Sequence, residues 1–274
     1  MIVHHLNCAT QCVIDGRLVS GNCSLLQRTP LVSHCLLVET SSGLVLVDTG
    51  LGLHDVEDPS QRLGNGFLFL ARPRLDPEET AVRQVERLGF SRNDVRHIIV
   101  THLDLDHAGG LSDFPAAWVH LLEEEYAAAM TPTSFTAHYR YRTSQWQLNP
   151  SWVRYQVQGA CWFGFECVSQ MEGLPPEILL VPLKGHTHGH TGVAVYTKNS
   201  WLLHAGDAYY YRGEMEPNEP CCPLGLALVQ RLGAVDNWMR RGNQERLRQL
   251  VREHNQQVRI FSAHDPVEFE DFLR

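Results

Sequence analysis

The chain has 274 residues, of which 43% are hydrophobic and 20% are charged, and its formal net charge is −8. The composition is typical of a globular protein, and the length suits a single α/β domain over residues 1–274 with an embedded insertion. The acidic balance argues against nucleic acid as a partner, because phosphate backbones attract basic surfaces. No run approaches the roughly 20 apolar residues of a membrane span, and no signal peptide is apparent, so we expect a cytoplasmic protein without a membrane partner.

Two apolar segments predict a β-hairpin near the beginning of the chain. They cover residues 34–40 and 44–48 and are joined by a Ser-Ser-Gly turn. The second strand ends at Asp48, where the chain must turn.

Residues 76–89 have the pattern of an amphipathic helix. Asp76 can cap the first turn, Pro77 suits the first helical position, and Glu79 would complete a capping box. Gly89 ends the pattern. The side chains expected to face the core are Val82, Val85 and Leu88.

Further apolar strands follow, and each runs directly into polar residues. We expect strands within 94–102, 177–186 and 257–265, a second hairpin over 192–207, and an amphipathic helix over 236–254. Active sites of layered α/β folds lie where strands end, so the polar residues at these ends are the candidate site.

Residues from about 130 to 175 are rich in aromatics and arginine and show no clean period. We interpret them as an insertion that covers the active site and forms a wall of a substrate pocket.

The eight cysteines of the chain include no CxxC pair, which makes a zinc knuckle a weak interpretation. Because no export signal is apparent, we expect reduced thiols that are buried or half-buried. Cys221 and Cys222 stand in a Pro-rich stretch that is interpreted as a loop.

The segment THLDLDHAGG, residues 101–110, concentrates side chains that can bind a metal. Residues two apart in an extended segment point the same way, so His102 and Asp104 can face one ion. A single histidine near a strand end is usually structural, but four unpaired polar groups together would be costly without a cation. Nitrogen and oxygen donors suit zinc, iron or manganese. The seven candidate ligands, all at or just past strand ends, are His102, Asp104, Asp106, His107, His186, Asp207 and His264.

Five segments resemble, in order, the motifs of the metallo-β-lactamase superfamily. They are VLVDTG, THLDLDHAGG for the HxHxDH motif, GHTHGHTG for the GHTPGH segment of the glyoxalase- and lactonase-like branches, AGDA and FSAHD. The resemblance covers residues from about 34 to 268. It implies a four-layer αββα sandwich with a metal site at one edge of the two sheets.

The resemblance also implies a role for each ligand at a centre of two divalent ions, zinc above iron or manganese. Asp207 would bridge the ions, Asp48 would orient a ligand by a hydrogen bond, and His190 is expected to be structural. The first ion would be held by His102, Asp104 and His186, and the second by Asp106, His107 and His264.

Asp104 stands where the family usually has histidine, so the motif reads HxDxDH. A carboxylate adds negative charge and makes harder metals more competitive. Flavodiiron-type members carry glutamate at this place, which makes a carboxylate compatible with two metals. The alternative is that Asp104 does not coordinate and one ion binds.

Two divalent ions would lower the pKa of a shared water towards ~7. Asp106 would orient the resulting hydroxide or pass a proton, and Tyr210 could donate a hydrogen bond to a developing oxyanion. The alternative for Tyr210 is a side chain that fills the pocket wall. The expected activity is hydrolysis of a small ester-like substrate, with a lactone as the leading candidate.

Other activities of the same fold stay open, namely a thioesterase, a phosphodiesterase or a mononuclear iron oxygenase. A non-catalytic binding relative is a further alternative, although seven competent donors argue against it. The expected partner is a small-molecule substrate. The oligomeric state stays open, with a homodimer as a candidate because homodimers are common among such relatives.

Overall fold

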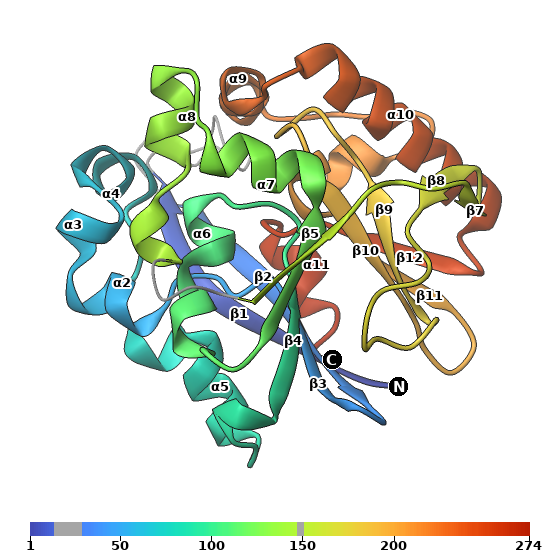
Figure 1. Ribbon diagram of the computed structural model, residues 1–274. Coiled ribbons are helices and arrows are strands. Elements are labelled where there is room, and N and C mark those ends of the chain that lie inside the picture. Colours follow the sequence, from blue (N-terminus) through green and yellow to red (C-terminus); the bar gives the residue numbers. More distant parts are fainter. Residues whose placement is uncertain (14–28, 147–150) are drawn as a thin grey trace.

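The computed structural model describes residues 1–13, 29–146 and 151–274, and most of its strands form two sheets (Figure 1). The larger sheet has the order β1-β2-β3-β4-β5-β6 and the smaller one the order β12-β11-β10-β9. The strands of the larger sheet are β1 (Ile2–Val13), β2 (Thr29–Thr40), β3 (Gly43–Val47), β4 (Val95–Ile99), β5 (Trp118–Leu122) and β6 (Ser151–Tyr155). Those of the smaller sheet are β9 (Ile178–Pro182), β10 (Thr191–Tyr196), β11 (Trp201–His204) and β12 (Val258–Phe261).

Side chains on the two faces of each sheet enter different cores. Leu36 and Val38 of β2 join the core between the sheets, together with Val193 of β10, whereas Leu37 joins a core on the outer face. This division follows from the alternation of side chains along a strand, and it explains why the strands are apolar on both faces.

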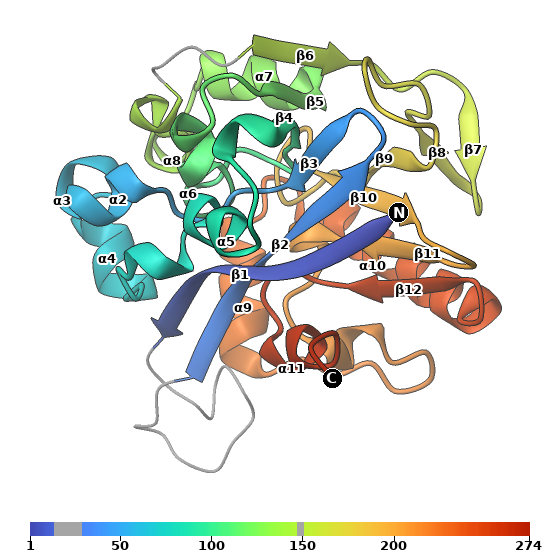
Figure 2. The ribbon, with the colours of Figure 1, turned by 90° about the horizontal axis from the view of Figure 1, so that it is seen from below.

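Helices cover both outer faces (Figure 2). Helix α5 (Ala81–Arg87) packs against the larger sheet through Val82 and Val85. Helix α10 (Asn237–His254) packs against the smaller sheet through Leu247 and Leu250. The resulting order of layers confirms the expected αββα sandwich.

Strand pairing brings distant strand ends together. Strands β3 and β4 are parallel, with Val47 opposite Ile99, so the chain leaves both strands at the same edge of the sheet. Strands β11 and β12 are also parallel, with His204 opposite Phe261. Both expected hairpins are confirmed, since β2 pairs with β3 and β10 with β11 in antiparallel fashion.

The expected helix over residues 76–89 is wrong in its first turn and in one core residue. Asp76 caps only a short 3₁₀ helix, η1 (Pro77–Glu79), and Thr80 is extended before α5 begins. No capping box forms, because the Glu79 carboxylate accepts hydrogen bonds from the backbone N–H and the hydroxyl of Thr10 on β1. Leu88, expected in the core, is 41% exposed because α5 ends at Arg87.

The segment interpreted as an insertion divides into parts with different positions. Its first helix, α8 (Phe135–Arg140), follows α7 (Glu123–Met130). Strand β6 pairs in parallel with β5 and extends the larger sheet, which the aperiodic sequence did not reveal. Strands β7 (Ala160–Trp162) and β8 (Phe165–Cys167) form a separate hairpin. The division into one domain with a site-covering insertion stays a prediction.

The other helical segments are short, and all but the last lie in the connections between strands. Cys221 and Cys222 lie in a loop between two of them, as expected. These short helical segments are α2 (Leu53–Glu57), α3 (Pro59–Arg62), α4 (Asn65–Ala71), η2 (Arg92–Asp94), α6 (Leu105–Ala108), η3 (Gly109–Asp113), η4 (Thr143–Gln145), η5 (Gly206–Ala208), η6 (Arg212–Met215), α9 (Leu224–Gly233) and α11 (Pro266–Glu270).

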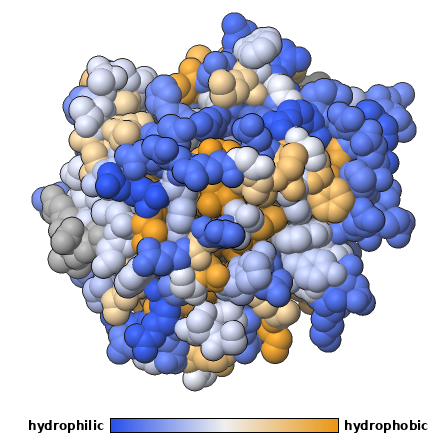
Figure 3. Space-filling model, turned by 45° about the vertical axis from the view of Figure 1, so that its right-hand side comes forward, coloured by the Kyte–Doolittle hydropathy of each residue, from blue (hydrophilic) through white to orange (hydrophobic). Residues whose placement is uncertain are grey.

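Seven cysteines are free thiols, and Cys23 lies outside the described residues. Cys161 and Cys221 are exposed, contrary to the expected burial. Among the described residues, none of the helices has both the length and the apolar character needed to cross a membrane. The face shown in Figure 3 is largely hydrophilic, with apolar side chains gathered towards its centre. The homodimer and the cytoplasmic location stay predictions.

Candidate metal centre

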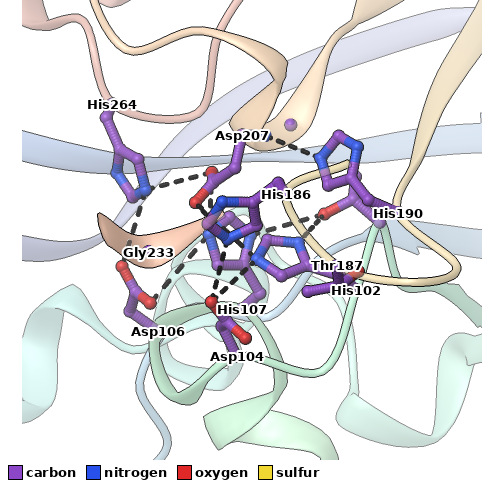
Figure 4. Close-up of polar contacts among 12 residues, drawn as sticks. His102, Asp104, Asp106, His107, His186, Thr187, His190, Asp207, Gly233 and His264 are labelled. Carbon is purple, nitrogen blue, oxygen red and sulfur yellow. Dashed lines mark hydrogen bonds and ion pairs between the residues drawn. The ribbon is translucent and has the colours of Figure 1, made fainter. Parts of the chain in front are cut away.

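The ends of strands from both sheets deliver the seven candidate ligands to one place (Figure 4). His102 and its neighbours follow β4, whereas His186, Asp207 and His264 follow β9, β11 and β12. The potential ligand atoms form two groups, and within each group they lie within 4.8 Å of one another. One group is His102, Asp104, His186 and Asp207, and the other is Asp106, His107 and His264.

The carboxylate of Asp207 lies between the two groups. Its Oδ2 is 3.6 Å from Nε2 of His102 and 3.4 Å from Nε2 of His186. Its Oδ1 is 3.2 Å from Nε2 of His107 and 3.1 Å from Nε2 of His264. One oxygen therefore faces each group, which is the arrangement that a bridging carboxylate requires.

The imidazoles are oriented through their Nδ1 atoms. Nδ1 of His107 lies 2.9 Å from Oδ2 of Asp48, and Nδ1 of His264 lies 2.8 Å from the carbonyl oxygen of Val32. A ring that donates its Nδ1–H to an oxygen presents Nε2 as the free donor atom for a metal. Both Nε2 atoms face Asp207, so the two rings are held ready for an ion.

Asp48 has the position that the resemblance implies for an orienting residue. Besides His107, its carboxylate accepts hydrogen bonds from the backbone N–H and the hydroxyl of Thr101, at 2.7 and 2.8 Å. Its φ of 57° is in the left-handed region, which aspartate tolerates better than most residues. Asp48 therefore joins the end of β3 to the segment that begins at Thr101.

The residues present fit a divalent metal. Among the described residues, Nε2 of His102, Nε2 of His107 and Oδ1 of Asp207 are buried without a hydrogen-bond partner. Each such atom costs about 1–3 kcal/mol when nothing satisfies it. A cation coordinated by these nitrogen and oxygen atoms would remove that cost at all three.

The charges of the cluster also favour a bound cation. Burial by itself raises the pKa of Asp207, but the surrounding histidines, with His264 and His107 foremost, hold that pKa well below its usual value. Burial lowers the pKa of His107, yet Asp207 and Asp48 raise it well above the ordinary value. The cluster thus stabilises positive charge between its carboxylates, as a metal site must.

His190 does not join the ligands, as expected. Its Nδ1 lies 2.9 Å from the carbonyl oxygen of Leu183, and its Nε2 accepts a hydrogen bond from the backbone N–H of Asp207 at 2.8 Å. Both ring nitrogens are therefore bonded to the backbone, one at Leu183 and the other at Asp207.

Tyr210 lies beside the cluster. Its hydroxyl donates a hydrogen bond of 2.8 Å to Oδ2 of Asp207, and its ring centroid is 4.8 Å from that of His264. The phenol therefore contacts the carboxylate between the two groups and lies beside a histidine of the second group.

Sequence reasoning missed Glu125, a buried residue of α7. Its Oε1 accepts a hydrogen bond of 3.0 Å from the backbone N–H of Leu103, which lies between two candidate ligands. Its Oε2 accepts from the hydroxyl of Thr187 at 2.6 Å and from the backbone N–H of Gly189 at 3.0 Å. A Cβ on Gly189 would lie 2.2 Å from the backbone nitrogen of Glu125, so only glycine allows this approach. In the sequence, Glu125 is merely the third of three consecutive glutamates at a helix start.

Two further side chains that sequence reasoning missed contact the acidic ligands. The amide Nε2 of Gln11 on β1 donates to Oδ2 of Asp106. The guanidinium of Arg140 at the end of α8 forms an ion pair with Asp104. Nothing in the local sequence of either residue signals these contacts.

A cleft of about 1180 Å³ opens onto the cluster at Asp104 and Asp106. Its walls come from α4, α7, α8 and the end of α9, and most of the wall is apolar. The apolar side chains that line it include Phe67, Leu70, Phe135, Leu232 and Val235.

Comparisons with known proteins agree with this geometry. The model of the "Metallo-beta-lactamase superfamily" matches residues 28–246. A protein of Mycobacterium tuberculosis named as a probable metallo-hydrolase is 39% identical over 264 residues, which cover 96% of this chain and 80% of that protein. An N-acyl homoserine lactonase of Bacillus cereus is 27% identical over 232 residues, which cover 83% of this chain and 85% of that enzyme.

Solved structures show the same fold. An N-acyl homoserine lactone hydrolase with the product N-hexanoyl-L-homoserine bound at its catalytic metal center superposes with a TM-score of 0.72 at 21% identity, covering 98% of this chain and 95% of that one. The dizinc quorum-quenching lactonase AidC gives a TM-score of 0.60 at 16% identity, covering 96% of this chain and 87% of that one. With strand-end ligands in two groups and a family model that spans most of its length, the chain belongs to the metallo-beta-lactamase superfamily and is a metallo-hydrolase of it.

Proposed function

We propose that the chain hydrolyses a small ester-like substrate, with a lactone as the leading candidate, at a centre of two divalent ions. His102, Asp104 and His186 would hold the first ion, Asp106, His107 and His264 would hold the second, and Asp207 would contribute to both. Zinc is the expected metal, and iron or manganese is compatible with the same donors. The observation that carries the proposal is the division of the donors into two groups with one oxygen of Asp207 facing each.

When bound, two divalent ions supply a nucleophilic hydroxide near neutral pH and polarise the carbonyl oxygen under attack. Asp106 would orient the nucleophile, and the amide of Gln11 donates a hydrogen bond that holds its carboxylate in place. This is the role proposed for Asp106 in addition to coordination.

Tyr210 is the proposed donor to the developing oxyanion. Burial raises the pKa of the phenol well above its ordinary value, and Asp207 raises it further. Tyr210 therefore keeps its proton across the neutral range and can act as a donor throughout. The hydroxyl donates to Oδ2 of Asp207 at 2.8 Å, so it must give up this hydrogen bond to donate to an oxyanion.

The shape and lining of the cleft support a substrate with an apolar portion. Most of the wall above Asp104 and Asp106 is apolar, whereas the floor carries the proposed ligands. An ester whose polar bond reaches the floor while an alkyl group lies along the wall would satisfy both environments. The lactone is favoured because relatives that align with most of this chain are N-acyl homoserine lactonases.

The test is an assay of metal-reconstituted enzyme on a panel of lactones with short and long acyl groups, thioesters and phosphodiesters. We expect turnover of lactones that a chelator abolishes and added zinc restores. Turnover of a thioester or phosphodiester alone would exclude the lactone and leave a metallo-hydrolase. Absence of bound metal in protein reconstituted with excess zinc would contradict the proposed centre itself.

A further inference from the structure

The unusual carboxylate of the metal-binding motif has a cationic partner. Nε of Arg140 lies 3.2 Å from Oδ1 of Asp104. Its Nη1 donates a hydrogen bond of 2.8 Å to the carbonyl oxygen of His186, and its Nη2 donates to the carbonyl oxygen of Gly233. One guanidinium thus joins Asp104 of the first motif, the loop of His186 and the end of α9.

The pair changes the charge of the cluster. The seven proposed ligands include three carboxylates, whereas the pattern with histidine at position 104 would include two. The single positive charge of Arg140 offsets the additional carboxylate. With this ion pair in place, the cluster is no more anionic than in the usual pattern.

The pair also directs the carboxylate. Because Oδ1 faces the guanidinium, Oδ2 is left to face the imidazoles, at 3.4 Å from Nε2 of His102 and 3.0 Å from Nε2 of His186. Only one oxygen of Asp104 is then directed towards the first metal position. A lysine could not reproduce this, because a single ammonium lacks the planar array of donors that reaches both carbonyl oxygens while its charge stays beside the carboxylate.

We propose that Arg140 is a positioning residue that acts together with Asp104 as a substitute for the family's usual histidine. The guanidinium neutralises the extra charge and turns one carboxylate oxygen towards the first ion. This inference rests on the proposed metal centre. It requires that Asp104 and Arg140 act as a pair. Substitution of one residue should preserve metal binding only together with the matching substitution of the other.

The experiment is a double-mutant cycle with metal affinity as its readout. The wild type, Asp104→His, Arg140→Gln and the double variant are compared by competition for zinc with a chromophoric chelator, and their cobalt forms by visible spectroscopy. Arg140→Lys tests geometry at constant charge. Arg154→Gln is the matched control, because it removes an arginine whose ion pair with Glu123, at 3.4 Å, is exposed and involves none of the candidate ligands.

We expect Asp104→His alone to weaken zinc binding at one site by at least about tenfold, because it leaves a guanidinium without its carboxylate beside a dication. The double variant should recover affinity to within about threefold of the wild type, since histidine then faces a neutral neighbour. Arg140→Gln and Arg140→Lys should alter the cobalt spectrum, and Arg154→Gln should not.

Additive effects would overturn the inference: if the change in zinc-binding free energy of the double variant equals the sum of the changes in the two single variants, the two positions are not coupled. An unchanged cobalt spectrum in Arg140→Gln would overturn the directing role. Circular dichroism of each metal-free variant establishes that it is folded before binding is measured. Failure of the wild type itself to bind zinc would instead refute the proposed metal centre.

Discussion

The buried carboxylate of Glu125 accepts a hydrogen bond of 2.6 Å from the hydroxyl of Thr187, one residue after His186. The same side chain accepts from the backbone N–H of Leu103, between His102 and Asp104. A single residue of α7 therefore fastens both loops that supply the proposed first metal position. Its own side chain does not belong to either group of candidate ligands.

Glu125→Gln tests this arrangement. A glutamine has one accepting oxygen, so its amide nitrogen would face a backbone N–H or the Thr187 hydroxyl and leave a buried donor unpaired. We expect a loss of about 1–3 kcal/mol in the free energy of unfolding and weaker zinc binding. Urea unfolding measures the free energy of unfolding, and chelator competition measures the zinc affinity. Glu124→Gln is the control, because its carboxylate is partly exposed and pairs with Lys184. Wild-type zinc affinity in Glu125→Gln would contradict the role.

Tyr210→Phe separates catalysis from metal binding. The substitution removes only the hydroxyl, so we expect metal content to stay at the wild-type level. If the hydroxyl stabilises an oxyanion, kcat should fall by about 10²–10³. Unchanged turnover on the best substrate, measured with equal metal content, would leave Tyr210 as a side chain of the pocket wall.

Removal of metal should destabilise the protein. Without a cation, the carboxylate of Asp207 stays buried among imidazoles with Oδ1 lacking a hydrogen-bond partner. We expect dialysis against a chelator to lower Tm, and zinc at 1,000 times its Kd to restore about 4 kcal/mol. Calorimetry at several zinc concentrations measures this dependence. A Tm that does not respond to zinc would exclude binding to the native state.

The stability should also depend on pH through Glu268 of α11. Burial, with a smaller contribution from Asp265, raises the pKa of this carboxyl from 4.5 to about 8. Between those values the folded state holds a proton that the unfolded state has released. The stability from this group is therefore fully present below pH 4.5 and is lost as the pH rises towards 8.

Glu268→Gln should flatten that dependence, because the amide does not titrate. Its oxygen can still accept from the backbone N–H of Ser262 and its nitrogen can face the Tyr209 hydroxyl. We expect the wild type, relative to the variant, to lose up to about 1.4 kcal/mol per pH unit in this window. Urea unfolding at pH values from 5 to 8 with saturating zinc measures this pH dependence. Glu270→Gln is the control, because Glu270 is exposed. Parallel curves for the wild type and Glu268→Gln would exclude the titration.

The accuracy of the sequence predictions varied with the range of the interactions involved. The hairpins and strand ends were predicted because apolar runs and turn residues are local signals. The first turn of the helix before Gly89 was wrong because Glu79 bonds to Thr10 on a distant strand instead of to its own helix. Strand β6 was missed because its pairing with β5, and not its own pattern, makes it a strand.

The sequence by itself determined the layered fold and the proximity of the candidate ligands, because each ligand directly follows an apolar strand and strand ends meet at one edge. It could not identify the residues that hold the ligands. Thr187 and Glu125 are 62 positions apart, and Gln11 and Asp106 are 95 apart. Such contacts arise only when the two sheets pack, since buried polar atoms must then find partners wherever the fold has placed them.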